Sequence, residues 1–334
     1  MTLLIAMPAP QRPEHATEFA ARCDALPELP ALTGMLAHAQ RQPDATDWRS
    51  GVLTALLGPG GGAAIAAATV AARAVANLPA GAALCFATPL HVMPGISRVH
   101  LPPGGWLQFD EIEAARWLES FNRDFGGPDV RLHAVTGGWL LLASCAAAAR
   151  DAAPEELIGQ PLARAPAKDE AERVLRRLGA EVEIWLARHP LNHEREARQL
   201  PPMNSLWFWG GAHAAALPLP ARLPQAVLVA GEPDAWLAGI AAHCALPLDH
   251  AADWRSLNAA LNTVLVLAAP REGLSARHWQ QQEANWFEPA LRALRAGAVN
   301  TLRWQIGARA WQLPNRSPLR WLRRRRPWYQ QVLA

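Results

Sequence analysis

Short, continuously apolar segments alternate with helical patterns along the C-terminal third of the chain, and this alternation limits the fold more than any other feature. Val227–Val229 and Val264–Leu267 are apolar throughout, as expected for strands buried on both faces of a sheet. Residues 233–244, 253–261 and 275–296 have the pattern of helices. This order predicts an α/β fold with a mostly parallel sheet and helices on both faces.

The rest of the chain adds a first strand, a long helix and two hairpins. Thr2–Met7 is an apolar run that prolines end, and we expect a buried strand there. Apolar residues recur at helical spacing over 168–188, which predicts a helix. Residues 131–135 and 139–143 flank Thr-Gly-Gly, a pattern typical of a hairpin, and a second hairpin is expected over 300–313.

Composition excludes several classes of protein. With 334 residues, of which 51% are hydrophobic, the chain is long enough to bury a large core. The formal net charge of +3 is too small for a chain-wide attraction to nucleic acid. No apolar run approaches the roughly 18 residues that cross a bilayer, and the four cysteines form no CxxC pair. These features indicate a globular protein of the cytoplasm with reduced thiols.

One glycine-rich segment formally matches a cofactor motif. Gly58, Gly60 and Ala63 have the spacing of the dinucleotide-binding fingerprint. That motif needs a strand before it and an acidic residue about 20 positions later to hold the ribose. The preceding segment has a helical pattern, and no Asp or Glu occurs between Asp47 and Asp110. We therefore expect a loop followed by an alanine-rich helix, and no bound cofactor.

The segment Arg188–Ala212 is the one stretch whose residue types suggest a role other than packing. It reads RHPLNHEREARQLPPMNSLWFWGGA and joins a polar cluster to a very apolar strand that ends at two glycines. An arginine fork and the backbone N–H groups of a glycine turn are both suited to bind a phosphate or a carboxylate. The residues Asn192, Arg195, Asn204, Ser205, Gly210 and Gly211 are therefore candidates for an anion pocket. We favour the other interpretation, a tight turn with a satisfied polar cluster.

Two histidines in the same segment are weaker candidates, for a metal. His189 and His193 have the spacing that places two ligands on one face of a helix. Pro190 argues against one continuous helix, and the order HPLNHE is not the HExxH of zinc enzymes. We expect helix-end capping and loop hydrogen bonds here, rather than a bound metal.

The same residues carry a resemblance to a known family. HPLNxxR followed by LPPxNSLWxWGG resembles the HPxNxxR…PxNxxxxxGxG segment of archaeal-type, cofactor-independent phosphoglycerate mutases. Over nearly its full length the chain resembles the RpfE-type regulatory proteins of bacteria, which are often grouped with those mutases. The segments Ala87–His91 and Glu181–Pro190 and the closing hairpin support this second resemblance.

The resemblance implies the fold of the alkaline phosphatase superfamily. We expect a discontinuous α/β core made of residues 1–79 and 200–314. Residues 80–199 would form an inserted α+β lobe, and residues 315–334 a basic tail rich in arginine and tryptophan.

Departures from the mutase pattern decide the expected function. The mutases carry a metal-binding Asp after the first strand, whereas Ile5–Pro8 has no carboxylate. They use a Ser or Thr nucleophile beside two metals, and residues 27–34 offer Thr33 without the set of acids that is needed. Residues 268–273 lack the Asp- and His-rich motif. Because two-metal phosphoryl transfer needs ligands that hold the ions about 4 Å apart, the sequence predicts a non-catalytic regulatory or interaction protein.

Two other functions stay open. The first is a metal-dependent phosphomutase or phosphatase with atypical ligands from His189, His193, Asp249, His250 and Asp253. The second is a nucleic-acid accessory protein, because the basic tail interleaves arginines, which pair with phosphates, with tryptophans, which stack on bases. An acidic protein partner would suit the same tail. The residues concerned are Arg316, Arg320, Trp321, Arg323, Arg324, Arg325, Arg326 and Trp328.

Overall fold

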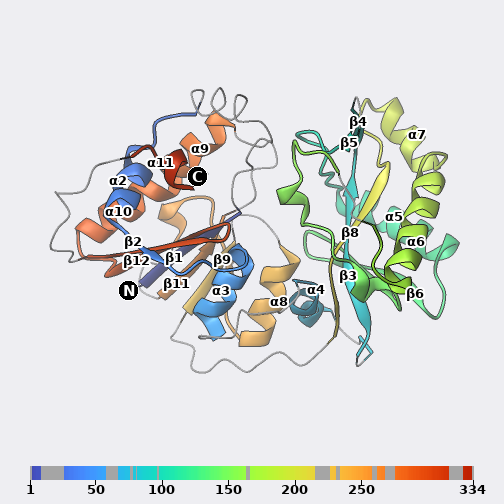
Figure 1. Cartoon of the computed structure of the whole chain (residues 1–334), viewed down its shortest axis with the longest axis horizontal. Coiled ribbons are helices and arrows are strands. Elements are labelled where there is room, and N and C mark those ends of the chain that lie inside the picture. Colours follow the sequence, from blue (N-terminus) through green and yellow to red (C-terminus); the bar gives the residue numbers. More distant parts are fainter. Residues whose placement is uncertain are drawn as a thin grey trace. The chain divides into compact units, whose positions relative to one another are not determined.

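The chain forms two compact units. The computed structural model describes residues 2–8, 26–57, 67–75, 78–79, 81–95, 98–162, 166–214, 226–230, 234–257, 262–267, 275–315 and 326–332. The first unit comprises residues 1–65, 218–233 and 244–334, and the second comprises residues 66–217 and 234–243. Each unit has its own sheet (Figure 1). Each also has its own hydrophobic core.

A seven-stranded sheet forms the centre of the first unit, in the order β10-β9-β11-β1-β12-β13-β2. Its strands are β1 (Thr2–Met7), β2 (Gln40–Gln42), β9 (Ala226–Ala230), β10 (Leu248–His250), β11 (Asn262–Val266), β12 (Thr301–Ile306) and β13 (Arg309–Pro314). The strands from β10 to β12 pair in parallel, whereas β13 pairs antiparallel with β12 and β2. The predicted α/β class, the buried first strand and the closing hairpin are confirmed.

Helices cover both faces of this sheet. They are α2 (Pro30–His38), α3 (Trp48–Leu57), α9 (Ala276–Gln282), α10 (Glu288–Arg295) and α11 (Trp328–Val332). Ile5 of β1 belongs to a core that residues of α2, α10 and α11 share. On the other face α3 packs against β1 and β12. There a Cβ at Gly51 would lie 2.3 Å from Oε1 of the buried Gln305, so a larger residue would force the Gln305 side chain to move.

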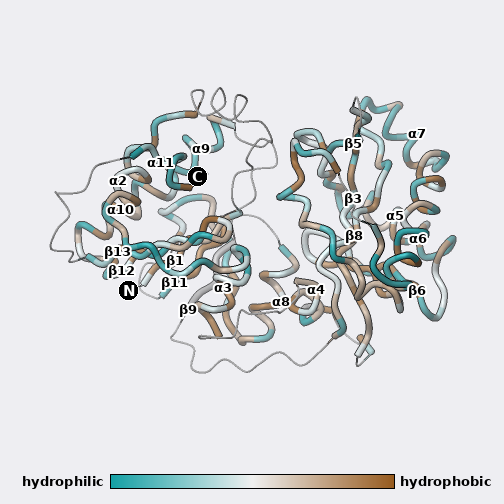
Figure 2. The backbone as a smooth tube through the Cα atoms, in the orientation of Figure 1, coloured by the Kyte–Doolittle hydropathy of each residue, from teal (hydrophilic) through white to brown (hydrophobic). Residues whose placement is uncertain are grey.

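A four-stranded antiparallel sheet, in the order β6-β7-β3-β8, forms the second unit. Its strands are β3 (Ala83–Leu90), β6 (Val130–Val135), β7 (Gly138–Ala143) and β8 (Ser205–His213), and a separate short hairpin joins β4 (Met93–Pro94) to β5 (Val99–His100). The predicted hairpin over 131–143 is confirmed. Two amphipathic helices, α5 (Glu111–Asp124) and α6 (Glu170–Leu186), contribute to one core with the sheet, and both mix hydrophilic with hydrophobic residues (Figure 2).

Strand β8 lies elsewhere than the predicted division into core and lobe placed it. Residues 200–217 were expected in the core, but β8 pairs with β3 from Leu90↔Ser205 to Ala83↔His213. The turn before β8 brings the chain back beside β3, where Asn204 N–H donates to the carbonyl of Leu90 at 3.0 Å. The strand therefore belongs to the second unit. The other helices of this unit include α4 (Ala67–Ala71), α7 (Pro190–Ala197) and most of α8 (Ala235–Cys244).

Helix α11 (Trp328–Val332), which lies within the predicted tail, packs into the core of the first unit. Trp328 is 1% exposed, and its Nε1 donates a hydrogen bond to the carbonyl of Pro27 at 3.1 Å. Its ring centroid lies 4.4 Å from that of Trp279. The expectation that Trp328 stacks on nucleic-acid bases is therefore wrong, because the indole is buried in the first unit. Arg326 is exposed, and the other predicted contacts of the tail lie outside the described residues.

Some sequence features fall where the structure gives no description. Gly58, Gly60 and Ala63 of the fingerprint-like segment lie outside the described residues, as do residues 268–273. Among the α-helices that the structure describes, α6 is the longest, with 17 residues, and it carries charges along its length. Across the described ranges, no helix combines the length and the apolar character that a bilayer crossing requires.

Candidate functional site

The predicted site segment begins at His189, which lies between α6 and α7. Its Nδ1 accepts a hydrogen bond from Leu191 N–H at 3.2 Å and so caps α7. The neutral ring therefore carries its proton on Nε2, which donates to Ser120 Oγ at 2.7 Å. Burial lowers the pKa of His189, whose ring lies against Trp117 and Trp185. A neutral histidine that donates to Ser120 cannot accept that hydroxyl's proton, so the pair is not an activated nucleophile.

Asn192 is buried, and its side-chain amide forms hydrogen bonds with the backbone. Its Nδ2 donates to the carbonyls of Leu186 and Met203, each at 2.7 Å, and its Oδ1 accepts from Met203 N–H at 2.8 Å. Both amide hydrogens are thus engaged. The side chain joins the end of α6 to the segment that enters β8, and it offers no donor to a ligand.

Arg195 is also engaged within the second unit. Its Nε donates to the carbonyl of Pro201 at 2.7 Å, and its Nη1 forms an ion pair with Glu113 of α5. The guanidinium carbon lies 4.9 Å from the ring centroid of Phe109. The side chains of Arg195 and Glu113 are only 6% and 13% exposed. The positive charge of Arg195, a candidate for anion binding, is paired with the partly buried carboxylate of Glu113.

Asn204 and Ser205 hold the start of β8. Asn204 Nδ2 donates to the carbonyl of Val92, and its Oδ1 accepts from Val92 N–H, both at 2.8 Å. Ser205 Oγ donates to a carboxylate oxygen of Glu183 on α6 at 3.1 Å. These bonds continue the sheet where strand pairing ends and connect it to the helix layer.

The two glycines serve close packing at the other end of β8. Gly210 has a φ of +64°, and a Cβ at Gly211 would lie 2.4 Å from the carbonyl oxygen of Ala146. Gly211 N–H donates to the carbonyl of Ala149 at 2.8 Å. At ~3.4 Å per residue the glycines lie roughly 17 Å along the strand from Ser205. The six predicted residues therefore do not converge on one pocket.

The candidate metal ligands are dispersed as well. His193 is exposed, with Nδ1 3.6 Å from a carboxylate oxygen of Glu196. Asp249 and His250 lie on β10, and the carboxylate of Asp253 accepts hydrogen bonds from backbone N–H groups of the next turn. Within the ranges that the structure describes, no group of three or more His, Cys, Asp or Glu side chains is arranged to hold a metal ion.

Thr33 lies in the first turn of α2, and a carboxylate occupies that helix end. Glu283 Oε1 accepts from Ala31 N–H, and its Oε2 accepts from Leu32 N–H at 3.2 Å. These are backbone donors that a helix N-terminus otherwise presents to an anion. Burial raises the pKa of Glu283, and the two backbone hydrogen bonds oppose that change. The helix end is thus filled from within the first unit.

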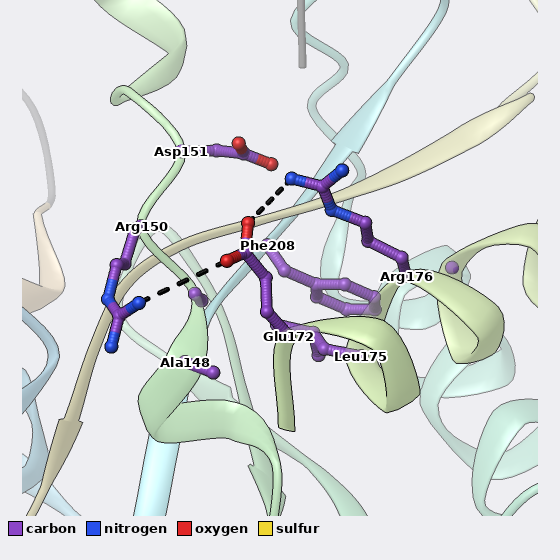
Figure 3. A pocket seen from close by; sticks show the side chains of 9 residues that line it. Ala148, Arg150, Asp151, Glu172, Leu175, Arg176 and Phe208 are labelled. Atoms are coloured by element: carbon purple, nitrogen blue, oxygen red, sulfur yellow. Dashed lines mark hydrogen bonds and ion pairs between the residues drawn. The ribbon is translucent and has the colours of Figure 1, made fainter. Parts of the chain in front are cut away.

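A pocket on the second unit, absent from the sequence-based expectations, lies between α6 and β8 (Figure 3). Its cavity volume is about 20 Å³, which is room for roughly one water molecule. Leu175, Gly179 and Phe208 form an apolar floor, and Arg150 and Arg176 flank Glu172 at the rim. A cavity of this size is far below the roughly 300–1,000 Å³ of small-ligand sites.

The rim of this pocket is held by unequal ion pairs. Glu172 Oε1 accepts from Arg176 Nη2 at 2.5 Å, and its Oε2 accepts from Lys168 N–H at 2.9 Å. The backbone hydrogen bond, followed by Arg176, lowers the pKa of Glu172. Arg150 Nη1 is farther from its partners, at 3.3 Å from Asp169 and 4.0 Å from Glu172. Arg150 is therefore the less firmly paired cation.

Some residues of this pocket could be recognised from sequence patterns. Glu172 and Arg176 have the spacing of an ion pair on one helix face, and Gly179 interrupts an otherwise strong helical pattern at a cost in stability. Phe208 lies in the apolar run that predicted β8. Arg150 has no such signal, because only the tertiary fold brings it beside α6.

Comparison with known proteins gives similarity in structure at low identity. No protein-family model and no curated protein matches the chain. The chain is similar to the solved structure of a cofactor-independent phosphoglycerate mutase from Thermoplasma acidophilum DSM 1728, at 13% identity and a TM-score of 0.38, over 94% of this chain and 89% of the other. It is also similar to the PH0037 protein from Pyrococcus horikoshii, at 11% identity and a TM-score of 0.46, over 94% and 87%. At these values, neither similarity supports an inference about activity.

Proposed function

We propose that this chain is a non-catalytic regulatory or interaction protein of the cytoplasm. The observation that carries the proposal is the ion pair between Arg195 and Glu113. The arginine that the sequence offered to an anion is buried against a carboxylate, and Asn192 beside it has no free amide hydrogen. The segment 188–212 therefore acts as a connector within the second unit.

Two further groups argue against phosphoryl-transfer catalysis. A phosphate at the N-terminus of α2 would meet the carboxylate of Glu283, which already accepts the N–H groups there. In the pocket of Figure 3, the lowered pKa of Glu172 moves it away from the range in which a carboxylate exchanges protons near neutral pH. Three described cysteines are free and buried, which fits a reducing compartment.

The test is a turnover assay on the full chain. Phosphate release and phosphate transfer are measured with manganese or zinc added, using phosphorylated three-carbon acids as substrates. A Thr33→Ala variant is the matched control, because Thr33 is the hydroxyl that the resemblance marks and it is only half-buried. We expect wild type and variant to give the same background rate. Metal-dependent turnover that disappears in the variant would overturn the proposal.

A further inference from the structure

The start of α7 is capped by a side chain that can lose its acceptor. Nδ1 of His189 accepts the N–H of Leu191 at 3.2 Å, and its backbone carbonyl accepts the N–H of Asn192 at 3.0 Å. The usual capping residues are serine, threonine, aspartate and asparagine, whose side-chain oxygens still accept in mild acid. A histidine offers Nδ1 as an acceptor only while its ring is neutral. The cap of α7 therefore depends on the protonation state of one ring.

Protonation of His189 acts on α7 in two ways. Both nitrogens of an imidazolium are donors, so Nδ1 would face the N–H of Leu191 as a second donor. The imidazolium also places a positive charge at a helix N-terminus, where the helix dipole disfavours cations. The contact of Nε2 with Ser120 survives, because that nitrogen already donates, at 2.7 Å. The cap of α7 is therefore the contact that the proton breaks.

The charged groups around the ring are paired with one another. Arg123 on α5 pairs with Asp124, and Arg116 on the same helix pairs with Glu194 of α7. The two carboxylates favour the imidazolium, and the two arginines oppose it. From α5 and α6 the ring otherwise meets two indoles, which carry no charge. Burial is the largest influence on the ring, and it lowers the pKa of His189.

We infer that α7 is an acid-sensitive element, whose first turn opens when His189 is protonated while the sheet of the second unit stays folded. Leu191 in this turn is 5% exposed and belongs to the hydrophobic core of the unit, so opening uncovers apolar surface. The next turn is held on α5 by the ion pairs of Glu194 and Arg195, which limit the opening. The inference goes beyond the proposed function and concerns conformation rather than turnover, so either can fail without the other.

The direction of the pH dependence follows from the two states of the ring. In the open turn His189 is solvated and has an ordinary pKa of about 6.5. In the closed turn burial lowers its pKa, so the open turn binds the proton at a higher pH. Opening is therefore favoured as pH falls through about 6.5 and suppressed above it.

Hydrogen exchange of backbone amides, resolved by NMR between about pH 7.5 and pH 5.5, tests this inference on the full chain. The protection factors of Leu191 and Asn192 should fall by up to about tenfold per pH unit below pH 6.5, because opening takes up one proton. Leu141 lies in the middle of β7, which pairs with a strand on each side, and its amide reports global unfolding. It should be better protected than the two α7 amides throughout. Equal protection at every pH would show that α7 opens only with the whole unit.

Two substitutions of His189 carry opposite expectations. His189→Asn keeps a capping oxygen that does not titrate, so the α7 amides should stay protected at every pH. His189→Gln can still reach Ser120 but provides no good cap, so these amides should exchange rapidly at every pH. His133→Asn is the matched control, since burial also lowers the pKa of this histidine on β6, and α7 should respond to pH as in wild type. Protection of α7 that is independent of pH in wild type, or the wild-type response in His189→Asn, would overturn the inference.

Discussion

Asn192 and Met203 exchange two hydrogen bonds, so that one side-chain amide pairs with both backbone groups of a single residue. Asn204 pairs in the same way with Val92. Each asparagine replaces a neighbouring strand at a place where the backbone has none, and so satisfies polar groups whose burial would otherwise cost stability. The polar residues of the predicted site therefore stabilise the second unit.

Removal of the Asn192 amide should destabilise the protein. Asn192→Ala leaves the N–H and carbonyl of Met203 and the carbonyl of Leu186 without this partner. We expect a loss of about 2–4 kcal/mol in the free energy of unfolding, measured by urea denaturation. His193→Ala is the control, because this nearby histidine is exposed and its loss should change stability by no more than about 0.5 kcal/mol. Equal effects would contradict the structural role of Asn192.

Trp328 should be required for the stability of the first unit. Trp328→Ala removes a buried indole and its hydrogen bond to Pro27, and we expect a loss of about 3–5 kcal/mol. Arg326→Ala, at an exposed position nearby, serves as the control in the same thermal or urea denaturation. A Trp328→Ala protein as stable as wild type would mean that the chain end does not dock as described.

Buried histidines should make stability fall in mild acid. Burial lowers the pKa of His189 and of His133 below the ordinary value, so the unfolded chain takes up these protons at a higher pH than the folded protein does. The free energy of unfolding should therefore decrease as pH falls from about 7.5 through the ordinary histidine pKa of about 6.5. His189→Asn keeps a capping oxygen for α7 and should make this decrease shallower. Equal slopes in wild type and His189→Asn would contradict the account.

Gly179 should be replaceable at a gain in stability. An added methyl group would meet Phe208 at an ordinary contact distance, and alanine stabilises a helix interior by roughly 0.5–1 kcal/mol relative to glycine. Gly179→Ala should therefore raise the urea midpoint of the protein. A lower midpoint would show that the space beside Phe208 is tighter than the structure indicates.

The α/β class could be predicted from sequence because its signals are local. The apolar run of β1 and the helical spacing of α6 each depend on neighbouring residues, and both elements were found where expected. The partner of β8 was not predictable in this way. Its apolar run suits a buried strand in either unit, and only the tertiary hydrogen bonds of Asn204 and the pairing with β3 decide between them.

The sequence could not decide the role of the candidate-site residues for a related reason. Asparagine and arginine have the same donors whether they face a ligand or the protein's own carbonyls, so residue type alone cannot separate the two roles. Glu113, which neutralises Arg195, lies on α5 and is distant in sequence. The pocket at Arg150 escaped prediction in the same way, because it is assembled from α6, β8 and the segment that follows β7.

A double-mutant cycle on Arg195 and Glu113 tests the central claim most directly. Unfolding free energies are measured for wild type, Arg195→Met, Glu113→Gln and the double variant, each with and without inorganic phosphate. A buried pair predicts a loss of about 3–5 kcal/mol for Arg195→Met, a double variant less destabilised than the sum of the singles, and no change with phosphate. Additive losses, together with stabilisation by phosphate that vanishes in Arg195→Met, would show that Arg195 faces a ligand.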